Sequence, residues 1–157
     1  MERMERPTLA VTPMDTSIRE LVRKSDHKIV AIWAADCAER VLPYFEEKYP
    51  EDNRPRKAIE ACRTWARTGV FRMADVRKTA LAAHAAAREV KEDHAARSAA
   101  RAAGQALSTA HVPAHAIAAA VYAATSVRDA ANSIDADIAT IKERDWQYQH
   151  LLKLNEK

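Results

Sequence analysis

Glycine and cysteine are scarce in this sequence, and aromatic residues make up only 6% of it. The 157 residues include two glycines and six prolines. With so few residues suited to tight turns, the composition argues against a β-rich fold. The same scarcity excludes Gly-rich phosphate-binding loops and the serine nucleophile elbow, because both motifs need several glycines at fixed spacings.

The two cysteines, Cys37 and Cys62, are too few for a disulfide scaffold. Each falls on the apolar side of a predicted helix, where a free thiol behaves as a small hydrophobic group. The neighbouring acids Asp36 and Glu39 would raise the pKa of the Cys37 thiol, which argues against a nucleophile. We expect reduced thiols and a cytoplasmic location.

No apolar segment of the sequence is long enough to act as a signal peptide or a transmembrane helix. Residues 1–13 contain charges and two prolines without an apolar run, and no later segment reaches 18 consecutive apolar residues. We therefore expect neither secretion nor membrane insertion.

Alanine dominates from Ala80 onward, so helix propensity is high. The length suits one domain with one core. We predict an all-α fold, a compact single-domain bundle of six to seven helices packed through alanine, with a flexible arm over residues 1–13 and the helical domain over residues 14–157.

Apolar periodicity and capping residues divide the chain into helices. Pro43 is expected to bend its helix or restart it as a short turn, and Gly69 to end the following one. A break near Asp93 is weighed against one continuous helix from residue 73 to 110. The predicted ranges are 16–24, 26–48 with the interruption at Pro43, 55–68, 73–91, 93–110, 113–124, and a last helix that starts between 126 and 133 and ends near 154.

The last helix carries a predicted inner stripe of Ile134, Ile138, Ile141, Tyr148 and Leu152. Asp145 falls within this stripe, and a structural ion pair at the edge of the core is the favoured interpretation. The functional alternative makes Asp145, Trp146 and His150 a recognition surface.

His111 and His115 are four residues apart, a spacing that can bind metal on one helix face. Pro113 lies between them and more readily begins a helix than continues one. A metal site would need His84 to fold onto this connection and an acid such as Asp145 or Glu60 to join it. We expect polar histidines between helices and no cofactor, with a metal site as an alternative.

Residues 54–78 include eight basic residues and only two acidic ones. Such a patch could contact phosphates, but its residues fall on several helix faces, as on an ordinary solvated surface. Nucleic-acid or phosphate binding is therefore kept as an alternative to a protein partner. The basic residues are Arg54, Arg56, Lys57, Arg63, Arg67, Arg72, Arg77 and Lys78.

Five segments make the chain resemble the Imm-5-like family of small bacterial and archaeal immunity proteins. The resemblance spans nearly everything after the amino-terminal arm. The segments are DHKIVAIWAADCAERVLPYFE (26–46), RPRKAIEA (54–61), MADVRKTALAAHAAAR (73–88), ARAAGQALSTAHVPAHA (100–116) and ERDWQYQHLLKL (143–154).

The resemblance implies a protein without catalytic activity that neutralises a toxin by binding it, and it assigns no binding residues. An inhibitor of a cationic nuclease would often be acidic, whereas this chain has a formal net charge of +3. We therefore expect a toxin that is not a strongly cationic nuclease, or inhibition away from its catalytic cleft. Self-association through alanine-rich faces is a further alternative.

Overall fold

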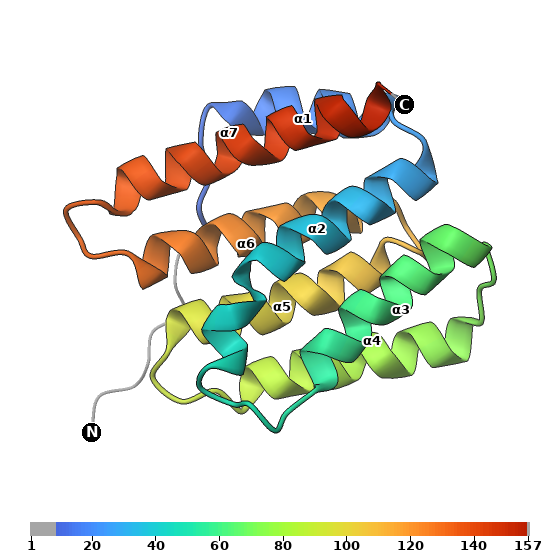
Figure 1. Cartoon of the computed structure of the whole chain (residues 1–157), viewed down its shortest axis with the longest axis horizontal. Coiled ribbons are helices and arrows are strands. Elements are labelled where there is room, and N and C mark those ends of the chain that lie inside the picture. Colours follow the sequence, from blue (N-terminus) through green and yellow to red (C-terminus); the bar gives the residue numbers. More distant parts are fainter. Residues whose placement is uncertain (1–8, 157) are drawn as a thin grey trace.

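A computed structural model describes residues 9–156 of the chain. Within this range the chain forms seven helices and no strand, so the predicted all-α fold is confirmed. One continuous hydrophobic core joins the helices, whose arrangement is shown in Figure 1. They are α1 (Met14–Lys24), α2 (His27–Glu46), α3 (Arg54–Thr68), α4 (Met73–Arg88), α5 (His94–Ser108), α6 (His115–Ala130) and α7 (Ala136–Asn155).

Two helix boundaries follow directly from residues that favour them. Gly69 ends α3 in the left-handed conformation, with a φ of 73°, which glycine adopts without a Cβ penalty. The Asp93 carboxylate accepts a hydrogen bond of 2.9 Å from the Ala96 amide and caps α5. The prediction of a break at Asp93 is confirmed, and the alternative of one continuous helix is wrong.

The predicted restart at Pro43 is wrong, because α2 continues through Pro43 to Glu46, and the alternative of a bend stays a prediction. Proline removes one hydrogen-bond donor, and here the loss falls in the last turn of a 20-residue helix. The Glu47 amide still donates to the Pro43 carbonyl at 2.9 Å. Burial of Leu42 and Phe45 on the same turn holds the helix end against the core.

The central helix is α5, which packs against α2, α3, α4 and α6 (Figure 1). Most of its buried side chains are alanine, so its neighbours approach closely on every side. The predicted inward positions of this helix are confirmed as buried. They are Ala96, Ala99, Ala103, Leu107 and, just beyond the helix, Ala110.

The predicted inner stripe of α7 is wrong at its amino-terminal end. Ile134, Ile138 and Ile141 are 88%, 57% and 57% exposed. The buried face of this helix consists mainly of polar side chains, most of whose polar atoms have hydrogen-bond partners. Its buried residues are Thr140, Glu143, Arg144, Gln147 and Leu151.

The polar face of α7 is joined to the rest of the bundle by hydrogen bonds. Arg40 binds Glu143 through two of its nitrogens, at 2.8 and 2.9 Å. Arg144 donates to Asp15 and to Gln147, each at 2.9 Å. Because these charges are paired across helices, their hydrogen bonds offset part of the desolvation cost of burying them in α7.

The expected arm over residues 1–13 lies partly outside the described residues, which begin at residue 9. Ala10 is 4% exposed, and its amide donates to the Thr125 hydroxyl at 3.0 Å. Contact with the domain therefore starts before the predicted boundary at residue 14.

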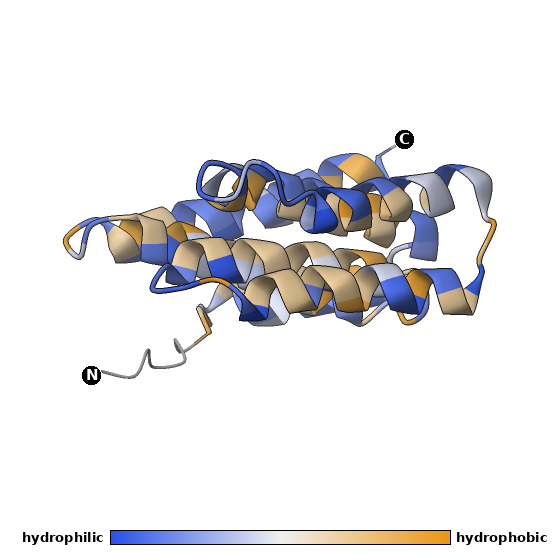
Figure 2. Cartoon of the chain, turned by 90° about the horizontal axis from the view of Figure 1, so that it is seen from below, coloured by the Kyte–Doolittle hydropathy of each residue, from blue (hydrophilic) through white to orange (hydrophobic). Residues whose placement is uncertain are grey.

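Apolar side chains are exposed at two opposite ends of the bundle. Figure 2 shows hydrophobic colour at the turn between α3 and α4 and at the tip of the α6–α7 connection. The first turn carries Val70, which is 65% exposed, and the second carries Ile134. A single exposed apolar residue is ordinary, so each end is a candidate contact surface only where further apolar side chains lie beside it.

Candidate binding surfaces

His111 and His115 do not share a helix face, as predicted. His111 lies in the connection between α5 and α6, Pro113 also precedes α6, and His115 is the first residue of that helix. The predicted start at Pro113 is two residues early, and α6 ends at Ala130 rather than near Ala124. The four-residue spacing therefore does not place the two side chains on one face of a helix.

The structure nevertheless brings His84, His111 and His115 together around one hollow of about 140 Å³. We call this hollow the histidine pocket. It lies between α4, the end of α5 and the start of α6, and its remaining lining is largely apolar. The other lining residues are Met73, Val76, Arg77, Ala80, Leu81 and Ser108.

Each histidine of the pocket is held in a different way. The Nδ1 of His115 lies 2.8 Å from the Gln105 Oε1, and the His111 ring stacks on Phe71 with centroids 6.1 Å apart. The His84 ring lies against the backbone of α5 at Gly104. A Cβ added to Gly104 would lie 2.7 Å from two atoms of that ring.

Gly104 is a residue that the sequence reasoning missed. An isolated glycine in an alanine-rich helix costs about 1 kcal/mol against alanine and often marks a close approach. That signal was present in the segment ARAAGQALS, although the sequence alone does not say that the approaching group is His84.

Two imidazoles of the pocket, those of His84 and His115, have a pKa below the usual value, which favours their neutral forms. Burial, Arg101, Arg88 and His115 lower the pKa of His84 from its usual value. Burial and His111 lower the pKa of His115. Neutral imidazoles can ligate metal, but among residues 9–156 no group of three histidine, cysteine, aspartate or glutamate side chains is placed to hold an ion. The described geometry does not form a metal centre.

The structure divides the predicted basic patch into two parts. Arg54 pairs with Asp52 and Glu89, Arg56 with Glu46, and Arg63 with Asp36 and Glu39. In the described part of the chain, the other five form no ion pair, and four of them lie between residues 67 and 78. These five residues are Lys57, Arg67, Arg72, Arg77 and Lys78.

One of the unpaired cations, Arg77, lines the pocket together with exposed apolar side chains. Met73 and Leu81 line it and are 39% and 56% exposed. The contact of Phe71 with His111 joins the α3–α4 turn to the α5–α6 connection, where Val112 is also exposed. We call this region the pocket surface: residues 67–81 of α3, its turn and α4, the α5–α6 connection 109–114, and the histidine pocket.

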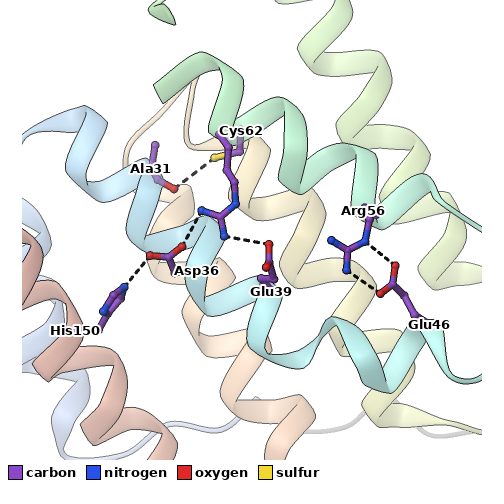
Figure 3. A network of polar contacts seen from close by, with 8 residues as sticks. Ala31, Asp36, Glu39, Glu46, Arg56, Cys62 and His150 are labelled. Atoms are coloured by element: carbon purple, nitrogen blue, oxygen red, sulfur yellow. Dashed lines mark hydrogen bonds and ion pairs between the residues drawn. The ribbon is translucent and has the colours of Figure 1, made fainter. Parts of the chain in front are cut away.

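A second surface lies where α7 packs beside α2, and it contains Trp146, His150 and the Arg63 side chain of α3. The Trp146 ring stacks on His150 with centroids 4.7 Å apart, and the Arg40 guanidinium lies 3.8 Å from the Trp146 ring centre. Figure 3 shows that His150 also contacts Asp36, at 2.7 Å. The residues around this shallow hollow are engaged with each other.

The predicted ion pair of Asp145 is wrong. Asp145 is exposed, and no described residue forms an ion pair with it. The buried charges of α7 are its two predecessors, Glu143 and Arg144. The prediction failed because the face of α7 that is buried is not the face on which the apolar stripe and Asp145 lie. Asp145 therefore does not join Trp146 and His150 through any described contact.

Both thiols are buried, as predicted. Burial, Glu143 and Asp36 raise the pKa of Cys37 well above its usual value. Burial raises the pKa of Cys62 to about 12, and its Sγ lies 3.4 Å from the Ala31 carbonyl (Figure 3). Neither sulfur is suited to act as a nucleophile at neutral pH.

Of the comparisons with known proteins, one finds a match, and it is to a protein family. None of the described helices is both long enough and apolar enough to cross a membrane. No curated protein and no solved structure matches the chain. The family model described as "Imm-5 like putative immunity protein" matches residues 20–154. The chain belongs to this Imm-5 like family.

Proposed function

We propose that this protein neutralises a protein toxin in the cytoplasm by binding it, without catalysis. The family match over residues 20–154 is the observation that carries the proposal. The surface chemistry supports it, since exposed apolar side chains lie beside the histidine pocket and both thiols are buried.

The pocket surface is the region where we place the toxin. Exposed apolar side chains around a small hollow, together with arginine, are the composition of a protein-binding surface. Between residues 67 and 78 four cations face a single acid, Asp75. The complementary partner presents carboxylates around one apolar or aromatic side chain, which the histidine pocket receives.

The proposed activity is tested by co-expression with candidate toxins encoded beside the gene. We expect one of them to stop growth alone, and growth to be restored when this protein is present. Size-exclusion chromatography of the purified pair should then show a complex. The proposal fails if no candidate toxin is neutralised and none forms a complex.

The position of the interface is tested with that toxin and charge-matched variants. Leu81→Asp should weaken binding by about 30-fold, the effect of losing about 2 kcal/mol at a central apolar contact. Arg77→Glu should weaken it less and reduce the association rate at low salt. Lys57→Glu makes the same charge change outside the pocket surface and should leave the affinity unchanged. Equal effects of Arg77→Glu and Lys57→Glu would place the toxin elsewhere.

Nucleic-acid binding by the same cations is the rival activity. A mobility-shift assay at two salt concentrations separates the two, because phosphate contacts weaken steeply as salt rises. A salt-sensitive shift that Arg72→Glu and Arg77→Glu remove would favour the rival. Elemental analysis of protein purified without a histidine tag tests the metal alternative at His84, His111 and His115.

A further inference from the structure

The exposed residues Ile134, Ile138 and Ile141 form one row on α7 and on the turn before it. We call them the isoleucine row. The spacing continues along the helix through Asp145, Tyr148 and Leu152, in alternating steps of four and three residues. This is the spacing of the apolar seam in a coiled coil. Isoleucine is among the residues most often buried, so three exposed ones in one seam indicate a contact surface.

Helix α1 covers the other half of this seam. Asp15, near its start, bonds Arg144 at 2.9 Å, and Ser25, just after its end, accepts a bond of 2.9 Å from Asn155. The 11 residues of α1 therefore run beside residues 144–155 of α7. Figure 1 shows the amino-terminal half of α7 extending beyond α1. Tyr148 is half-buried, whereas the three side chains of the isoleucine row are exposed and no helix among residues 9–156 covers them.

We propose that the isoleucine row joins two copies of this chain, with their α7 helices packed antiparallel. A two-fold axis between Ala139 and Thr140 would place Ile138 of each copy against Ile141 of the other. Lys142 of each copy then lies next to Asp135 of the other copy. The two-fold axis repeats this pair, so an attractive pair of charges lies at each end of the contact. The surface is thus complementary to itself.

The seam also selects the antiparallel arrangement over the parallel one. In a parallel pair each Asp145 would face Asp145 of the second copy at a seam position, and the two carboxylates would repel each other. In the antiparallel pair each Asp145 faces Ile134 of the second copy at the end of the contact, where it stays in water. The covering α1 helices then lie at opposite ends of the pair.

The small size of the row sets the strength of the expected dimer. A stable interface uses roughly 20–30 residues a side, and the isoleucine row with its charged neighbours is much smaller. We therefore expect a reversible dimer whose population rises with protein concentration. This inference is independent of the proposed toxin binding, because it uses a different surface of the bundle.

Sedimentation velocity across a concentration series tests the dimer. Wild-type protein should shift from monomer toward dimer as concentration rises, and Ile138→Asp should weaken the association at least ten-fold. Val70→Asp makes the same change at a residue of similar exposure, 65%, at the opposite end of the bundle, and should associate like wild type. A wild-type protein that stays monomeric at the highest concentration, or equal association of all three, would overturn the proposal.

Engineered cysteines test the arrangement, because the chain's own two cysteines are buried. Ile138→Cys and Ile141→Cys proteins are mixed in a glutathione redox buffer, and the disulfide-linked peptides are identified by mass spectrometry. The antiparallel pair predicts that the disulfide between positions 138 and 141 forms faster than either disulfide between identical positions. Preferred linkage of identical positions would mean a parallel pair and would overturn the arrangement.

A toxin-neutralisation assay distinguishes a second copy of the chain from the toxin as the partner that binds the isoleucine row. Ile138→Asp should lose dimerisation and keep any neutralising activity of the wild-type protein. If wild type is monomeric and Ile138→Asp loses neutralisation, the row binds the toxin instead, and the dimer proposal fails while the proposed function stands.

Discussion

Helices α5 and α7 are both buried against their neighbours, but with opposite chemistry. Seven of the ten buried residues of α5 are alanine, whereas four of the five buried residues of α7 are polar. Four helices surround α5, so a polar side chain there would find few partners, and small apolar ones let the helices approach. At the edge of the bundle, α7 buries polar groups that reach partners on α1, α2 and α6.

The largest test of this contrast is the removal of a buried charge from α7. Arg144 is 0% exposed and binds Asp15 and Gln147. Arg144→Ala leaves a cavity and two polar groups without their donor, and we expect a loss of about 3 kcal/mol in the free energy of unfolding. Urea denaturation measures it.

The variant Arg144→Met keeps the volume of the side chain while removing its charge. The Arg144 Nε is buried without a hydrogen-bond partner among the described residues, so the native arginine already has one unsatisfied donor. We expect Arg144→Met to lose much less stability than Arg144→Ala. Equal losses for the two variants would mean that the ion pair, rather than packing, holds α7 in place.

The corresponding test in α5 is to enlarge an alanine. Ala103 is 0% exposed, and a leucine at this position would force the surrounding helices apart. We expect Ala103→Leu to cost about 2 kcal/mol by overpacking. Ala74→Leu makes the same change at an exposed position of α4 and should change the midpoint of urea denaturation very little. A tolerated Ala103→Leu would contradict tight packing around α5.

Sequence periodicity predicted α5 well because every buried position of its inward stripe is apolar. Ala96, Ala99, Ala103 and Leu107 repeat at helical spacing, and the cap at Asp93 is a local interaction between residues three apart. Both features are local, so the order of the residues is enough to specify them. The all-α fold and the alanine packing are therefore predictable from the sequence.

The same reasoning failed on α7 because its burial depends on partners far away in the sequence. Glu143 can be buried because it pairs with Arg40, and Arg144 because it pairs with Asp15. A hydropathy pattern does not predict such ion pairs. The isoleucines were assigned to the core for the same reason. The histidine pocket is similar, since the packing of α4 against α5 brings His84 to residues 111 and 115, and no local pattern specifies that packing.

A smaller effect is expected where α5 meets His84. Gly104→Ala adds a Cβ that collides with the His84 ring, which offsets the helix propensity that alanine gains over glycine. In a His84→Ala background the collision is absent, and the same substitution should stabilise the protein by about 1 kcal/mol. Thermal unfolding of the four proteins of this cycle measures the coupling. No difference between the two backgrounds would show that the His84 ring moves aside freely.

The smallest expected effect is the pH dependence contributed by His84, which faces Arg88, Arg101 and His115. Its pKa in the folded protein lies below the unfolded value of about 6.5, so the unfolded chain binds a proton more readily. The contribution of His84 to stability is therefore complete above pH 6.5 and declines as the pH falls through the folded pKa. Replacing it by glutamine removes this decline and leaves the other titrating groups in place. The wild-type denaturation midpoint should thus fall more between pH 7 and pH 5 than that of His84→Gln. Equal falls in the two proteins would mean that the imidazole is hydrated as fully in the pocket as in the unfolded chain.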